Sequence, residues 1–252
     1  MVPMRKLSAL KVVSHALASV RDYRSVGLHL GLAWTGLLWL LGIAGLIADM
    51  VTPAEAPTGA VTIVITILSI AASLAAFSSI AVGWHRFILR DEIGSAFRLD
   101  RLVWIYAGNF LAVMILVVLP VLVLALLASS MVQAAALVAA PAVLYAEVFA
   151  MRLWVKLPAV ALGRQDFGFR EALAVSDGNF WPLLAVLLLN GAIVLGAVLV
   201  LNLAMMLFEP VNPVLAGVVV LSLGAAFQLF YILFYTGIFT ALYGFFVEGR
   251  DF

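Results

Sequence analysis

Six long apolar runs, separated by short polar or charged stretches, make up most of the chain. An α-helix needs about 20 mainly apolar residues to cross a hydrocarbon core of about 30 Å, and each run is long enough. We therefore expect an all-α membrane protein whose six transmembrane helices pair as three hairpins. The predicted spans are residues 27–50, 61–83, 104–127, 132–153, 180–208 and 214–246.

An amphipathic segment precedes the first predicted hairpin, in residues 5–24. Its apolar residues recur at helical spacing, at Leu10, Val13, Leu17 and Val20. The polar residues fall largely away from that stripe, at Lys11, His15, Ser19 and Asp22. The pattern is typical of a helix lying in the membrane interface, and a solvated helix packed on another segment is the alternative.

Two further surface helices are expected, one before each of the other hairpins. They are predicted within residues 87–103 and at residues 169–176. On this interpretation residues 1–26 form an amphipathic interfacial helix, and residues 27–252 form a six-helix transmembrane domain.

Composition and charge fix the class and the orientation. Hydrophobic residues make up 66% of the chain and charged residues only 11%, against about 25% charged in a typical soluble domain. All 14 Lys and Arg residues lie before the first span, in every second connection, or near the carboxyl end. The other three connections carry only Asp49, Glu55 and Glu209. The positive-inside rule therefore predicts that both termini and the long basic connections are cytoplasmic.

A threefold repeat is suggested by the spacing of the hairpins. The odd-numbered spans open near Gly27, Trp104 and Trp181, and the sequence Gly-Asn-Phe occurs at residues 108–110 and again at residues 178–180. At the second copy we expect the glycine to end the surface helix and the asparagine to start the next helix. Because the period exceeds 50 residues and the letters differ between the units, the repeat is suggested and not established.

Small residues and prolines predict how the spans pack. Glycines at residues 27 and 31, and at 42 and 45, are spaced to let another helix approach closely. Pro120 and Pro141 lie at the same predicted depth on two arms of one hairpin, and each is expected to bend its helix.

The stretch from Arg152 to Trp181 resembles a known protein family. Its letters Leu-Pro-Ala-Val-Ala at residues 157–161, Glu-Ala at 171–172 and Gly-Asn-Phe-Trp at 178–181 are similar to those of small bacterial six-span integral membrane proteins. That family is related to the membrane-anchor domain of glycerophosphodiester phosphodiesterases. The resemblance implies an anchor-like or accessory protein of the bacterial inner (cytoplasmic) membrane, and it implies no catalysis.

Three polar residues inside the spans are candidates for function: Glu147, Asn190 and Gln228. Ionisable residues inside a membrane are functional candidates by default, and Glu147 is predicted about 7 Å from the cytoplasmic interface. The alternative for Glu147 is a structural ion pair with Arg152 or with a basic residue of a neighbouring helix. Asn190 and Gln228 are expected at similar depth, facing the interior and able to bond each other.

Four residues are expected at the level of the lipid headgroups: His85, Arg86, Arg152 and Lys156. Basic side chains there can bind anionic lipid, and they also orient the protein. A solvated or lipid-facing histidine would be ordinary at position 85.

The sequence offers little support for catalysis or metal binding. It contains no cysteine, and its three histidines have no metal-site spacing. It also lacks the motifs of common nucleophilic, metallopeptidase and phosphate-binding sites. We expect no enzyme activity, no cofactor, no metal and no nucleic-acid partner.

Two functions remain for such a chain. The first is a non-catalytic accessory, scaffold or anchor-like protein that binds membrane lipids, anionic ones among them, and partner membrane proteins or a second copy of itself. The alternative is a small-solute transporter or channel that uses Glu147, Asn190 and Gln228. A third class, an enzyme acting on lipid, would need Glu147 and His85 in one pocket.

Overall fold

The computed structural model describes residues 6–51, 59–131 and 133–251. Every regular element of these described residues is a helix, and they contain no β-strand. The elements are α1 (Ala9–Asp22), α2 (Arg24–Val51), α3 (Ala60–Arg90), α4 (Arg101–Val113), the π-helical turn η1 (Met114–Val118), α5 (Leu119–Met131), α6 (Gln133–Trp154), α7 (Lys156–Ala161), α8 (Phe169–Val175), α9 (Phe180–Phe208) and α10 (Pro213–Phe246). Glu55 and Val132 lie outside the described residues.

Five of the described helices are long and apolar enough to cross a membrane. They are α2, α3, the continuous run from Arg101 to Leu124, α9 and α10. The all-helical membrane class predicted from hydropathy is therefore supported. Four of these helices have bounds close to the predicted spans, whereas α3 runs on to Arg90, past the predicted end at residue 83. α6 is a further long helix, and it packs along α5.

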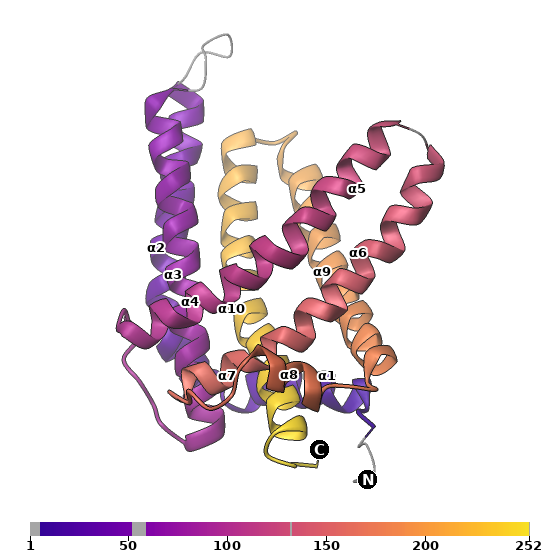
Figure 1. Cartoon of the computed structure of the whole chain (residues 1–252). Helices are drawn as coiled ribbons and strands as arrows, with labels where there is room; N and C mark the ends of the chain where they lie inside the picture. The colour runs from indigo at the N-terminus through magenta and orange to yellow at the C-terminus, as the bar shows by residue number, and fades with distance from the viewer. Residues whose placement is uncertain (1–5, 52–58, 132, 252) are drawn as a thin grey trace.

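The long helices stand on a layer of shorter ones (Figure 1). α2 packs against α3, α5 against α6, and α9 against α10. α10 also contacts α1, α2, α3 and α7, so it is the central helix of the bundle. We call the end that carries α1, α7, α8 and the carboxyl end of α10 the basic end.

The buried core lies toward the basic end. On α10 almost every residue from Leu229 to Phe245 is buried, which is typical of a helix that is apolar on all sides. The far half of α9 exposes large apolar side chains from Leu195 to Phe208. Apolar surface of this kind is stable in lipid, so only one half of the bundle needs close packing between all its helices.

α1 lies beneath the bundle and buries one face against it (Figure 1). Val12, Val13, Ala16 and Ser19 are buried, and α1 packs on α10 and α9. Of the predicted apolar stripe, Val13 is buried, whereas Leu10 is 70% exposed and Leu17 is 38% exposed, so only part of the stripe packs on the bundle. The buried face carries small side chains because α10 approaches α1 closely at Ala16.

Glycines let α10 approach its neighbours. A Cβ atom on Gly31 of α2 would lie 2.0 Å from Cδ1 of Leu229, and one on Gly27 would lie 2.6 Å from Cδ1 of Leu233. A Cβ atom on Gly237 of α10 would lie 3.3 Å from that of Ala16. The predicted close approach at residues 27 and 31 is confirmed, and the helix that approaches is α10.

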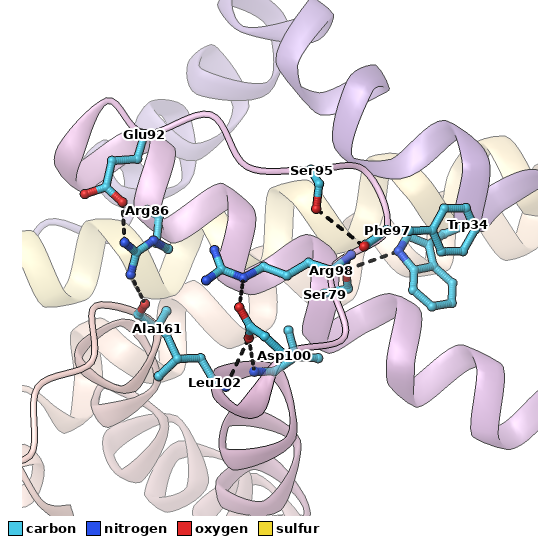
Figure 2. A network of polar contacts seen from close by, with 11 residues as sticks. Trp34, Ser79, Arg86, Glu92, Ser95, Phe97, Arg98, Asp100, Leu102 and Ala161 are labelled. Carbon is cyan, nitrogen blue, oxygen red and sulfur yellow. Dashed lines mark hydrogen bonds and ion pairs between the residues drawn. The ribbon is translucent and has the colours of Figure 1, made fainter.

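The prediction of a separate surface helix within residues 87–103 is wrong. α3 continues to Arg90, where Asp91 adopts a left-handed conformation (φ 57°) and ends it, and residues 91–100 form no helix. The hydroxyl of Ser79 on α3 accepts hydrogen bonds from Nε1 of Trp34, at 3.2 Å, and from the backbone N–H of Arg98, at 3.1 Å (Figure 2). The bond from Arg98 ties the segment to α3, and the bond from Trp34 ties α2 to the same hydroxyl.

The two prolines act differently. Pro120 follows the π-helical turn η1, in which wider backbone bonding makes room for a residue that lacks an N–H and crowds the preceding turn. Pro141 lies inside α6, which remains α-helical on both sides of it. The departure from α-helical bonding is the π-helical turn before Pro120, and the bend expected at each proline stays a prediction.

The α8–α9 junction uses the predicted residues in a different way. Gly178 has φ 71°, as expected for a glycine that ends a helix. Asn179 precedes α9 but makes no capping bond. Its buried Oδ1 instead accepts a 2.9 Å hydrogen bond from the backbone N–H of Leu7, which ties the amino-terminal segment to this junction.

Candidate functional site

Two of the four residues expected at headgroup level, Arg86 and Arg152, form hydrogen bonds within the protein. Arg86 donates to the carbonyl of Ala161 at 3.1 Å and pairs with Glu92 (Figure 2). Arg152 donates to the carbonyl of Leu173 at 2.8 Å and to the hydroxyl of Ser176 at 3.0 Å. Because these acceptors lie at the carboxyl end of α8, the guanidinium also neutralises the negative end of that helix dipole.

Lys156 is the headgroup-level cation that no acid neutralises directly. It lies at the start of α7, half-buried, with Nζ 4.0 Å above the ring of Phe169. Burial lowers the pKa of Lys156, and the nearby negative charge of Glu171 partly opposes this. The Glu171 carboxylate is itself engaged, because it accepts the backbone N–H of Gly168 at 2.9 Å. In the described part of the chain Lys156 forms no ion pair.

A hollow of about 270 Å³ opens beside Lys156, and we call it the Lys156 hollow. α4 supplies an apolar wall with Leu102 and Ile105, together with the amide of Asn109. α7 and the loop that follows supply the polar side, with Lys156 and Arg164. The hollow therefore combines an apolar wall on a candidate span with positive charge at the basic end.

Arg164 holds the loop side of the hollow in place. It makes two hydrogen bonds to Asp166, at 3.1 and 2.6 Å, and a third to the hydroxyl of Tyr243 at 2.7 Å. The bonds to Asp166 and then to Tyr243 raise the pKa of Arg164, and the bond from Arg164 lowers the pKa of Asp166. Since Asp166 balances the charge of Arg164, Lys156 carries the net positive charge at the hollow.

His85 is buried, which overturns the expectation of a solvated or lipid-facing side chain. Its exposed fraction is 0%. Nδ1 lies 2.8 Å from the hydroxyl of Thr240, and Nε2 lies 3.1 Å from the hydroxyl of Tyr106. Thr240 already donates its proton to the carbonyl of Thr236 at 2.8 Å, so the network assigns the proton of His85 to Nδ1. Nε2 then accepts from Tyr106, and all three side chains are satisfied.

Among the intramembrane candidates, Asn190 bonds a tyrosine of α10 and does not bond Gln228. Asn190 is 7% exposed, and its Nδ2 donates to the hydroxyl of Tyr231 at 3.1 Å. The expectation that Asn190 faces the bundle interior is confirmed. Gln228 lies one turn away on α10 and makes no hydrogen bond to Asn190 in the described structure. The predicted amide pair is therefore wrong by one helical turn.

Glu147 does not pair with Arg152, whose guanidinium binds Ser176, Leu173 and Asp177. Glu147 is partly buried on α6, and it forms no hydrogen bond or ion pair within the described structure. Among the described residues Glu147 forms no ion pair with Arg152 or with a basic residue of a neighbouring helix, so that alternative is wrong.

Several residues of these sites were missed from the sequence. Tyr106, Tyr231 and Thr240 stand in apolar runs, where an aromatic or small hydroxyl residue is ordinary. Their buried hydroxyls need partners, and this need is a usable signal once a buried histidine or amide is known at the same depth. Within the described residues no group of three or more His, Cys, Asp or Glu is placed to hold a metal ion.

No protein-family model matches the chain, and neither a curated protein nor a solved structure matches it. The resemblance to six-span anchor-like proteins therefore stays a prediction.

Proposed function

We propose that this chain is a non-catalytic, multi-pass membrane protein that binds an anionic phospholipid in the Lys156 hollow and acts as an anchor or scaffold for partner membrane proteins. One observation carries the proposal. Among the described residues Lys156 is a half-buried cation without a paired acid, and it lines a hollow whose other wall is apolar.

The chemistry of the hollow fits a glycerophospholipid. The phosphate would lie against Lys156, and an acyl chain would follow Leu102 and Ile105 along α4. A basic side chain near an anionic membrane surface contributes about 1 kcal/mol of attraction, which corresponds to roughly fivefold in affinity. Asp166 and Glu171 limit the net positive charge, so we expect one bound lipid and not a broad charged patch.

The test compares Lys156→Gln with Lys11→Gln, which removes an exposed lysine from α1 at the same end. Each protein is placed in nanodiscs of phosphatidylglycerol and phosphatidylcholine, and the retained lipid is counted by native mass spectrometry. Wild type and Lys11→Gln should keep one phosphatidylglycerol, and Lys156→Gln should bind it about fivefold more weakly. Equal retention by all three proteins, or a preference for phosphatidylcholine, would refute the proposal.

The proposed topology has six spans, with α6 as the fourth crossing, and places the basic end in the cytoplasm. It is supported by the one-sided distribution of basic residues and by the pairing of α5 with α6. The bacterial inner membrane is the location we propose, on the strength of the resemblance alone.

Because the chain has no cysteine, single cysteines report topology without background. In intact cells a membrane-impermeant maleimide should label Val211→Cys, in the α9–α10 turn, and Ser130→Cys, near the end of α5. It should label Gln165→Cys, at the basic end, only after the cells are opened. If Ser130→Cys behaved like Gln165→Cys, α5 and α6 would not cross the membrane and the six-span topology would be rejected.

A further inference from the structure

The dipeptide Arg-Asp occurs three times in the chain, each time where a helix ends. It stands at residues 21–22 at the end of α1, at residues 90–91 at the end of α3, and at residues 250–251 shortly after α10. The second and third copies line one open hollow of about 980 Å³, together with Tyr23 at the end of α1. We call it the Arg-Asp hollow.

The lining of the Arg-Asp hollow carries balanced charge. The end of α3 supplies Arg90 and Asp91, and the segment after α10 supplies Arg250 and Asp251. Arg250 also pairs with Glu248 at 2.7 Å. Arg90 and Asp91 are exposed, and within the described residues neither side chain forms a hydrogen bond or an ion pair. One cation and one anion are therefore available to a ligand on the same wall.

Asp91 is held at the carboxyl end of α3 by its backbone. It has φ 57°, and its N–H donates to the carbonyl of Phe87 at 2.8 Å. Aspartate and asparagine adopt this left-handed conformation more readily than most residues. A carboxylate at this position adds to the negative end of the helix dipole. A positive group of a ligand beside Asp91 would therefore be stabilised by both.

Aromatic rings and hydroxyl oxygens complete the lining. Tyr23 and Phe87 contact each other edge to face, with ring centroids 5.1 Å apart, and both line the hollow. Tyr23 is 46% exposed, and aromatic faces attract ammonium groups. The hydroxyl of Ser19 also lines the hollow, and because it donates to the carbonyl of His15 at 2.9 Å its lone pairs can still accept.

We propose that the Arg-Asp hollow binds a zwitterionic phosphoethanolamine group, as found in the headgroup of phosphatidylethanolamine. Arg90 would hold the phosphate, because a guanidinium matches phosphate oxygens with two parallel hydrogen bonds. Asp91 and the hydroxyl of Tyr23 would accept from the primary ammonium. A ligand with one charge of each sign suits a lining of balanced charge, whereas a purely anionic ligand would lie against two carboxylates.

The inference is independent of the Lys156 hollow, whose lining comes from α4, α7 and the following loop. Native mass spectrometry of the protein in detergent measures binding of phosphatidylethanolamine, phosphatidylcholine and phosphatidylglycerol with matched acyl chains. Wild type should prefer phosphatidylethanolamine to phosphatidylcholine by about fivefold, because the choline nitrogen has no N–H to donate. Lys156→Gln should bind phosphatidylethanolamine as wild type does, and a loss in that variant would assign the lipid to the other hollow.

Two substitutions separate the two charges of the ligand. Asp91→Asn keeps a residue that tolerates positive φ and removes only the negative charge. It should weaken phosphatidylethanolamine binding about threefold without weakening that of phosphatidylglycerol, which has no ammonium. Arg90→Gln should weaken phosphatidylethanolamine binding about fivefold.

The copy of the dipeptide at the end of α1 provides matched controls. Arg21 and Asp22 are exposed and pair with each other at 2.8 Å. Arg21→Gln and Asp22→Asn should both bind phosphatidylethanolamine as wild type does. Equal binding of phosphatidylethanolamine and phosphatidylcholine by wild type would overturn the proposal. Unchanged phosphatidylethanolamine binding in Arg90→Gln and Asp91→Asn would also overturn it.

The phosphoethanolamine group could come from a lipid or from solution, and wild type alone distinguishes the two sources. Equilibrium dialysis measures binding of radiolabelled phosphoethanolamine and of lysophosphatidylethanolamine. Binding of only the acylated compound supports a lipid headgroup, and equal binding of both supports the free compound. Binding of neither would overturn the inference whether or not the variants fold.

Discussion

The backbone N–H of Leu7 donates a 2.9 Å hydrogen bond to Oδ1 of Asn179, across 172 residues of sequence. Leu7 is buried in the same apolar core as the amino-terminal half of α9. The contact joins the two ends of the layer at the basic end, because Leu7 leads into α1 and Asn179 joins α8 to α9.

Replacing Asn179 with alanine should free the amino-terminal segment. The buried N–H of Leu7 would lose its acceptor, at a cost of about 1 to 3 kcal/mol. Hydrogen exchange at residues 6–12 should accelerate, and the melting temperature should fall. Asn202→Ala is the matched control, since this exposed amide bonds only the carbonyl of Val198 on its own helix. Similar exchange in the two variants would contradict the assigned role.

The positions of the long helices could be predicted because they depend on local composition. Apolar runs and basic flanks mark where a helix leaves lipid, and α9 (Phe180–Phe208) matches the predicted fifth span. The segment after α3 could not be predicted in this way. Its conformation depends on Ser79 and Trp34, which lie outside it in the sequence, and no periodicity within residues 87–103 reports those bonds.

The candidate sites were predicted less well than the helices, because their contacts also join residues that lie far apart in the sequence. Counting 1.5 Å per residue placed Asn190 near the right depth but paired it with Gln228. The observed partner, Tyr231, is one turn further along α10, an error that helix tilt is large enough to produce. His85 stands at the end of an apolar run, and only the packing of α4 and α10 shows that it is buried.

The α2–α10 contact predicts opposite effects for two glycine substitutions on one helix. At Gly31→Ala the new Cβ would lie 2.0 Å from Cδ1 of Leu229, so Leu229 must move, and we expect a loss of about 1 to 3 kcal/mol. At Gly36→Ala no atom lies within 4 Å, and the gain in helix propensity should stabilise by about 0.5 to 1 kcal/mol. Reversible unfolding in mixed detergent measures both, and equal effects would show that α2 and α10 do not pack as described.

Removing His85 should destabilise the protein through the partners it leaves. His85→Leu would strand the buried hydroxyl of Tyr106 and remove the donor to Thr240, so we expect a loss of at least about 2 kcal/mol. A double-mutant cycle with Thr240→Val measures the coupling between the two side chains. His29→Gln is the control, because His29 is exposed and bonds only the carbonyl of Gly94. Additive effects of His85→Leu and Thr240→Val would contradict the network.

His15 predicts part of the acid sensitivity of the protein. It lines an open hollow of about 980 Å³ formed by α1, the end of α3 and the segment after α10. Burial, and then the positive charge of Arg250, lower the pKa of His15 below its usual value. The folded protein therefore binds this proton less readily than the unfolded chain, whose histidines titrate near about 6.5.

The sign of the effect follows from that difference. Above about pH 6.5 the imidazole is neutral in both states, and its contribution to stability is complete. As the pH falls below about 6.5, the unfolded chain gains a proton that the folded protein still rejects, so stability declines until the lowered pKa is passed. His15→Gln stays neutral, and its melting temperature should fall less than that of wild type between about pH 6.5 and 5. Parallel melting curves for the two proteins across that interval would show that His15 titrates alike in both states, so its surroundings in the fold would not disfavour the charged form.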